Sequence, residues 1–182
     1  SIYYNNTAPA GTSASFTVTA AATDNVSGIW KVNFPTITGF TGGGDATSSP
    51  YVTSYTWTPS ANSSGTWTIT AYDNAMNWTL AGFNVYLDNT PPSGGSISYT
   101  NDLYTTPSVS VTLNAGTDAG SGIATMVLQR ADATFADDQD GTFSSWSTIS
   151  SSPGSSYTDT TVTKGHSYKY QYVVMDNVSN QA

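Results

Sequence analysis

Residues 23–29 read TDNVSGI and residues 117–123 read TDAGSGI, so this chain of 182 residues repeats itself. Two further stretches recur in the same order, SIYYNN at 1–6 as SISYTN at 96–101 and DNAMN at 73–77 as DNVSN at 176–180. The offsets are 94, 95 and 103 residues, which leaves about nine extra residues in the second copy. Three ordered matches at a nearly constant spacing predict two homologous domains.

Each copy contains short segments in which apolar and polar residues alternate, as they do along a half-buried β-strand. In one such segment of each copy, three alternate residues are expected to point into a core. They are Trp30, Val32 and Phe34 in the first copy, and Ala124, Met126 and Leu128 in the second. Trp67 is expected inside on a later strand. Helical spacing is absent, so the sequence predicts an all-β protein of two antiparallel β-sandwiches.

A proline pair marks the junction between the copies. Residues 88–95 read DNTPPSGG, in which the proline pair makes a stiff linker and the glycines that follow favour a turn. We therefore predict one sandwich over residues 1–90 and a second over 91–182. The second copy ends soon after its DNVSN motif, so it is expected to lack its last strand in this chain. Either the segment was cut from a longer protein, or another chain supplies the strand.

The residues around these strands resemble two known families. The strand GTWTIT at 65–70, the Asp-Asn turn at 73–74 and the DNTPP junction at 88–92 resemble the Ig-like repeats of large bacterial and archaeal cell-surface proteins. The segments SYTDTTV at 156–162 and YKYQYVV at 168–174 are similar to the last strands and tyrosine-bearing turn of fibronectin type III domains. The resemblance implies tandem Ig-like folds in an adhesin, surface-layer or filament protein outside the cell.

Composition excludes several functional classes. Lys and Arg number 4 against 12 acidic residues, all of them Asp, which gives a net charge of −8. So few cations argue against binding to nucleic acid or to an anionic membrane surface. No apolar run approaches the length of a membrane span. With no Cys, one His and no Gly-x-Ser-x-Gly motif, we expect no enzymatic activity.

Five aspartates fall at matched loop positions or in the junction. Asp88, Asp118 and Asp176 are expected to converge between the domains, and Asp24 and Asp73 form the corresponding pair in the first domain. Clustered carboxylates with few cations nearby suit Ca²⁺, the one cofactor that we consider. The alternative is that these aspartates accept hydrogen bonds from loop amides in Asx turns.

Two tryptophans lie outside the expected cores. Trp78 and Trp146 occupy loop-like or edge positions, where an exposed aromatic ring can stack on a sugar. They are candidates for glycan binding.

The sequence favours a non-enzymatic, extracellular structural or adhesive module that acts as a rod-like spacer in a microbial surface protein. Its partners would be neighbouring Ig-like domains or identical chains, and glycans are a further candidate. One alternative is a subunit of an extracellular filament or surface layer that assembles by contacts or strand addition between chains. Another is a carbohydrate-binding accessory module of a secreted enzyme.

Overall fold

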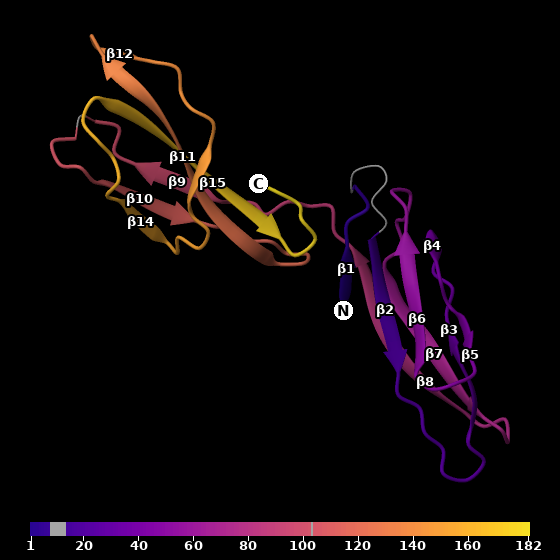
Figure 1. Cartoon of the computed structure of the whole chain (residues 1–182). Coiled ribbons are helices and arrows are strands. Elements are labelled where there is room, and N and C mark those ends of the chain that lie inside the picture. Colours follow the sequence, from indigo (N-terminus) through magenta and orange to yellow (C-terminus); the bar gives the residue numbers. More distant parts are fainter. Residues whose placement is uncertain (8–13, 103) are drawn as a thin grey trace. The chain divides into compact units, whose positions relative to one another are not determined.

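The computed structural model describes residues 1–7, 14–102 and 104–182. The chain divides into two compact units, Ser1–Asn89 and Thr90–Ala182, and the boundary lies one residue before the one placed from the sequence. All regular elements of the described residues are strands, as predicted (Figure 1). Within these residues no helix is long and apolar enough to cross a membrane.

Unit 1 consists of two sheets. Its strands are β1 (Ile2–Tyr4), β2 (Ala14–Ala20), β3 (Ile29–Phe34), β4 (Phe40–Thr41), β5 (Gly44–Ala46), β6 (Tyr51–Trp57), β7 (Gly65–Asp73) and β8 (Trp78–Leu87). One sheet has the order β1-β8-β7-β3-β5 and the other β2-β6-β4. All neighbours are antiparallel except β1 and β8, which run parallel.

The core of unit 1 lies between these two sheets, because alternate side chains of each strand point inward. Phe34 and Val85 from the larger sheet are almost fully buried, as is Tyr55 from the smaller one. The Tyr55 hydroxyl donates to the carbonyl oxygen of Pro35 at 2.6 Å, which satisfies its polar end inside the core. Trp67 packs against the same cluster, as predicted.

Unit 2 also consists of two sheets. Its strands are β9 (Ser96–Tyr99), β10 (Val109–Asn114), β11 (Ile123–Ala136), β12 (Gln139–Asp140), β13 (Ser147–Ser150), β14 (Ser156–Asp159) and β15 (His166–Asp176). One sheet has the order β14-β10-β9. In the other, β15 pairs with one edge of β11, and β12 and β13 pair with the opposite edge. Val111, Leu128 and Tyr170 lie in the core between the sheets.

Two residues expected in the core are exposed instead. Trp30 is 41% exposed, and Ala124 is exposed at the corresponding place in unit 2. The prediction is wrong at both positions because the strand pairing shifts there by one residue, between Ile29 and Lys31 in β3 and at the same point of β11. Such a β-bulge inserts one extra residue and turns its side chain out of the alternation. The remaining inward positions of β3 follow the prediction.

Candidate functional site

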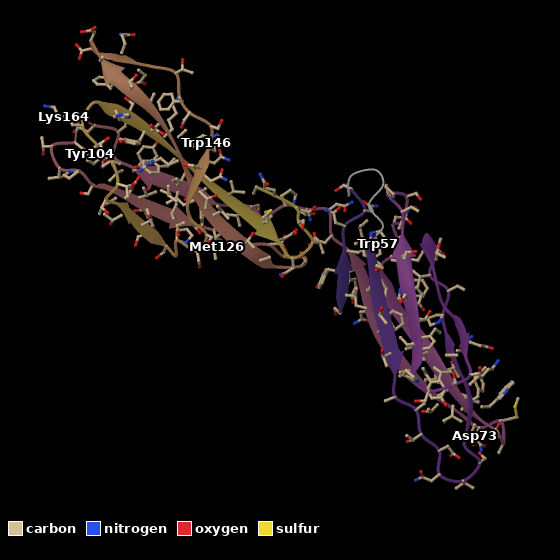
Figure 2. The ribbon with its side chains drawn as sticks, in the orientation of Figure 1. Trp57, Asp73, Tyr104, Met126, Trp146 and Lys164 are labelled. Atoms are coloured by element: carbon tan, nitrogen blue, oxygen red, sulfur yellow. The ribbon has the colours of Figure 1, made fainter. Side chains whose placement is uncertain are left out.

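Two loops meet at one end of unit 1, where Figure 2 labels Asp73. The β2–β3 loop contains Asp24, and the β7–β8 hairpin contains Asp73 and Asn74. The Asn74 side chain joins the loops, because its Nδ2 donates to the carbonyl oxygens of Ser27 at 2.8 Å and Gly28 at 3.1 Å. Its backbone N–H also donates to the Gly28 carbonyl at 3.0 Å. We call this end the Asp–Asn end.

Unit 2 has the same arrangement at its own Asp–Asn end. Asn177 Nδ2 donates to the carbonyl oxygens of Ser121 at 2.8 Å and Gly122 at 3.0 Å. The Asn177 backbone N–H donates to the Gly122 carbonyl at 3.0 Å. The repeat seen in the sequence is therefore a repeat of individual hydrogen bonds.

The β7–β8 hairpin of unit 1 is held by the Asp73 carboxylate. Its Oδ1 accepts the backbone N–H groups of Ala75 at 2.9 Å and Asn77 at 2.8 Å, and its Oδ2 accepts Asn77 Nδ2 at 2.8 Å. Met76 takes a left-handed backbone conformation, with φ of 69°, to close the turn. The side chain of one aspartate thus organises the whole hairpin, as in an Asx turn.

The segment after β15 repeats this geometry around Asp176. Its Oδ1 accepts the N–H groups of Val178 at 2.9 Å and Asn180 at 2.8 Å, and its Oδ2 accepts Asn180 Nδ2 at 2.6 Å. Ser179 has a φ of 71°, close to that of Met76. The aspartates that the sequence singled out in both copies therefore have the same local structural role.

The other aspartate of each end caps the preceding loop. Asp24 Oδ1 accepts three backbone N–H groups, from Val26 at 3.0 Å, Ser27 at 2.6 Å and Gly28 at 2.8 Å. Asp118 Oδ1 accepts the N–H of Gly122 at 2.5 Å. These contacts match the Asx-turn alternative that the sequence left open beside calcium.

The amides lower the pKa values of the two aspartates in unit 1. For Asp24 the largest cause is the backbone hydrogen bond from Gly28, and those from Ser27 and Val26 act in the same direction. For Asp73 the largest cause is the Asn77 side-chain amide. Both carboxylates are therefore ionised at neutral pH, with N–H dipoles from the loops compensating their charge.

The structure brings together two of the predicted calcium ligands of unit 2. A carboxylate oxygen of Asp118 and one of Asp176 lie within 4.8 Å of each other, a spacing that one cation can bridge. Asp88 belongs to unit 1, where its backbone N–H donates to the Tyr4 carbonyl at 2.8 Å. Its part in a calcium site stays a prediction.

The start of unit 2 is tied to the Asp118 loop. Ser93 and Thr117 exchange two backbone hydrogen bonds, each 2.9 Å long. Gly116 makes this possible, because its φ is 73° and a Cβ atom there would lie 2.1 Å from the Ser93 carbonyl oxygen. The residues that follow the proline pair are thus fixed beside the Asp–Asn end of unit 2.

The two tryptophans proposed as sugar-stacking residues are exposed, as predicted. Trp78 is 63% exposed and lines a cavity of about 380 Å³ together with Asp24 and Asp73. Trp146 is 44% exposed on unit 2, beside β13. Sequence reasoning did not foresee that Trp78 and the aspartate pair of unit 1 share one cavity.

A buried polar cluster in unit 2 was missed entirely. Asp159 is 1% exposed, and its Oδ2 accepts Arg130 Nη1 at 2.7 Å and the Tyr170 hydroxyl at 3.0 Å. Burial acts to raise the pKa of Asp159, but hydrogen bonds from Thr161 and Arg130 outweigh it, and the net shift is downward. The available signal was Arg130, the one Arg of the chain, inside a segment that alternates like a strand.

No family model matches this chain, and none of the curated proteins compared with it matches significantly.

Proposed function

We propose that this chain is a non-enzymatic structural module of an extracellular microbial surface protein, in which Ig-like β-sandwiches in tandem act as spacers. The observation that carries the proposal is the repetition of the same Asp–Asn end, hydrogen bond for hydrogen bond, in two consecutive units. A chain built by repeating one stable unit gains length with each copy, which is the property that a spacer needs.

The Ig-like assignment of the units is part of this proposal. Two sheets around one core in each unit, antiparallel in all their pairs except β1–β8, support it. In unit 2 the Thr163 backbone N–H donates to the Tyr168 hydroxyl at 2.8 Å, which agrees with the tyrosine-bearing turn of fibronectin type III domains. Fold alone does not determine function, so the spacer role rests on the repetition.

The Asp–Asn end of unit 1 also offers a surface for a neighbouring domain. Val26, Met76, Trp78 and Leu80 are exposed there, with Val26 at 96%. Exposed apolar side chains that gather at one end of a unit are typical of interaction surfaces. A preceding domain of the same kind is the partner that we propose for it.

Small-angle X-ray scattering of the whole chain tests the spacer proposal. A spacer is expected to give a distance distribution with two separated centres of mass and a maximum dimension near the sum of the two unit lengths. A compact distribution, with the two units packed side by side over their length, would contradict the proposal. Repeating the measurement after Ca²⁺ addition shows whether the ion narrows that distribution.

Carbohydrate binding is a second candidate function, because the exposed Trp78 ring lines a cavity that also contains two carboxylates. Titration of a panel of neutral and acidic oligosaccharides, followed by NMR of the Trp78 indole N–H, tests it. Binding that is lost in Trp78→Ala and kept in Trp146→Ala would support this candidate. A flat titration over the whole panel would remove it.

A further inference from the structure

The outward face of the larger sheet of unit 1 carries a strip of side chains along β7 and β8 (Figure 1). The inward positions of β7 are fixed by Trp67 and Ile69, which pack in the core, so the residues that alternate with them point outward. Residues opposite each other in an antiparallel pair share a face, which adds residues of β8 to the strip. The outward pairs are Tyr72 with Trp78, Thr70 with Leu80, Thr68 with Gly82, and Thr66 with Asn84. We call this set the outer strip.

Aromatic rings stand at one end of the outer strip. Trp30, which the β-bulge of β3 turns outward, has its ring centroid 6.2 Å from that of Tyr72, with an angle of 69° between the ring planes. Lys31 Nζ lies 4.4 Å from the Trp30 ring centroid, a cation–π contact that orients the ring. Trp78 is the strip residue opposite Tyr72. This end therefore presents aromatic surface that the core of unit 1 does not use.

A second aromatic pair stands at the far end of the same face. Tyr3 of β1 lies opposite Tyr86 of β8, and their ring centroids are 5.6 Å apart. Tyr86 is eight residues along β8 from Trp78, which is about 26 Å in an extended strand. Between the two aromatic groups the strip consists mainly of threonine and asparagine, whose hydroxyl and amide groups both donate and accept hydrogen bonds.

Gly82 lies in the middle of the outer strip, and the fold gives no reason for a glycine there. Its φ is not positive, and the pairing of β7 with β8 passes through it without a bulge. A Cβ atom would lie 3.6 Å from Thr66 Cγ2 and 3.7 Å from the Trp67 carbonyl oxygen, which are ordinary van der Waals distances. Glycine weakens the interior of a strand, and it often marks a place where a ligand approaches the backbone closely.

The face around the outer strip carries no net charge. At the outward positions of this sheet, within the described residues, the charged side chains are Lys31 and Asp45, whose Nζ and Oδ2 atoms are 2.8 Å apart. Asn33 Nδ2 donates to the other carboxylate oxygen of Asp45 at 2.6 Å. A charged ligand would gain little attraction from this face, so a neutral ligand fits it better.

We propose that the outer strip binds one extended strand of a neutral polysaccharide. Sugar rings stack their apolar C–H faces on the Trp30–Tyr72 group at one end and on the Tyr3–Tyr86 pair at the other. Between these groups, sugar hydroxyls exchange hydrogen bonds with the threonine hydroxyls of the strip. Gly82 lets the polysaccharide lie close to the backbone of β8.

The proposal rests on the carbohydrate candidate given above and adds the ligand class and the position of the site. That candidate uses the cavity that contains Asp24 and Asp73, whereas the outer strip lies on the outward face of the sheet and needs no carboxylate. Trp78 borders both, so it does not distinguish them. Trp30 and Gly82 do not line the cavity, and they therefore report on the strip alone.

NMR titration of the whole chain with linear β-linked oligomers of glucose, N-acetylglucosamine, xylose and mannose tests the proposal. An oligomer long enough to reach both aromatic groups is expected to shift the signals of the Trp30 indole N–H and the Gly82 amide. It is expected to bind about tenfold or more tightly than the disaccharide of the same sugar, because it engages two groups at once. An oligogalacturonate serves as the charged control, and tighter binding of it would overturn the neutral ligand class.

Gly82→Thr separates a binding role from a structural one. Threonine suits an exposed strand position, so the melting temperature of unit 1 is expected to stay the same or rise. Its side chain occupies the place of the sugar and is expected to weaken binding by about tenfold or more, as is Trp30→Ala. The control is Val52→Ala, at a residue that is 43% exposed on the outward side of the smaller sheet, and it is expected to change binding by less than about twofold.

Three results would overturn the proposal in different ways. Binding that is kept in Gly82→Thr and Trp30→Ala but lost in Trp78→Ala would leave the cavity as the carbohydrate site. A flat titration over the whole panel would remove the outer strip and the carbohydrate candidate together, while the spacer role, tested by scattering, would stand. Shifts of the Trp30 and Gly82 signals with protein concentration alone would assign the strip to a second copy of this chain.

Discussion

Unit 1 and unit 2 have the same structure at their Asp–Asn ends and differ in the pairing of one strand. The Asp73 and Asp176 segments make the same hydrogen bonds, each with a left-handed residue at the same position. Yet β7 is paired with β8 over eight residues, whereas on the corresponding edge of β15 the described residues pair after the turn only through Met175 and Val174. The turn therefore forms whether or not a full strand follows it. Its stability is local, arising from the aspartate and asparagine side chains, whereas the strand pairing next to it differs between the units.

The first strands of the two units also differ in their pairing. The SIYY segment forms β1, which pairs in parallel with β8, whereas the similar SISY segment forms β9, which pairs antiparallel with β10 of the other sheet. Two similar segments therefore join different sheets in the two units. Strand preference is readable from such a segment, but its partner is decided by the tertiary structure.

The largest expected effect concerns the ion pairs of the two units. Asp159→Asn is expected to destabilise unit 2 by about 3–5 kcal/mol, because it leaves the Arg130 guanidinium without its buried counter-charge. Asp45→Asn, the matched change at the more exposed Lys31–Asp45 pair, is expected to destabilise unit 1 far less, because water screens that pair. Urea unfolding followed through separate NMR signals of the two units measures both.

Similar losses in the free energy of unfolding in the two variants would contradict this prediction. A loss confined to unit 2 in Asp159→Asn, with unit 1 unfolding as before, would support it and would show that the units unfold independently.

The next prediction is that the two Asp–Asn ends contribute equally to the stability of their units. Asn74→Ala and Asn177→Ala each remove two side-chain hydrogen bonds to loop carbonyls. Each is expected to lower the stability of its own unit by about 1–2 kcal/mol, because one neutral hydrogen bond contributes about 1 kcal/mol. The same unfolding experiment applies, and losses that differ by more than a factor of about three would mean that the two Asp–Asn ends are not equivalent.

Acid should weaken unit 1 through Asp24 and Asp73. The pKa values of both are lower in the folded state, so their contribution is present above the unfolded pKa near 4 and is lost as pH falls through the lower folded values. Thermal melts between neutral pH and about pH 2 are expected to show this loss. Asp24→Ser keeps an acceptor without a titrating charge and should flatten the curve; an unchanged slope would contradict the assignment.

The smallest expected effect is that of calcium removal. Asp73 and Asp176 use both carboxylate oxygens on hydrogen bonds from their own hairpins. Adding a chelator is therefore expected to shift the melting temperature of either unit by less than about 2 °C, well below the shift that 1 kcal/mol produces. A larger drop confined to unit 2, reversed by Ca²⁺, would establish the site predicted at Asp88, Asp118 and Asp176.

Sequence reasoning reached the all-β class and the repeated Asp–Asn ends because both follow from local patterns. Alternation identifies strands, and an aspartate followed by Asn and a left-handed position defines the hairpin. Trp30 was misplaced because the bulge that exposes it depends on the neighbouring strand, not on the residues of β3. The contact between Arg130 and Asp159 joins residues 29 apart, and no local pattern predicts it.

Amide exchange along β15 in the chain alone tests the central difference between the units most directly. The N–H groups of Lys169 and Gln171 point to β11, whereas those of Tyr168, Tyr170 and Tyr172 point to the opposite edge of β15, where no strand of the described residues is hydrogen-bonded to them. In dilute protein the three tyrosine amides are expected to exchange about tenfold or more faster than those of Lys169 and Gln171. The amides of β7 that point to β8 are expected to stay protected. Equal protection of all five β15 amides would contradict an unpaired edge along this part of β15.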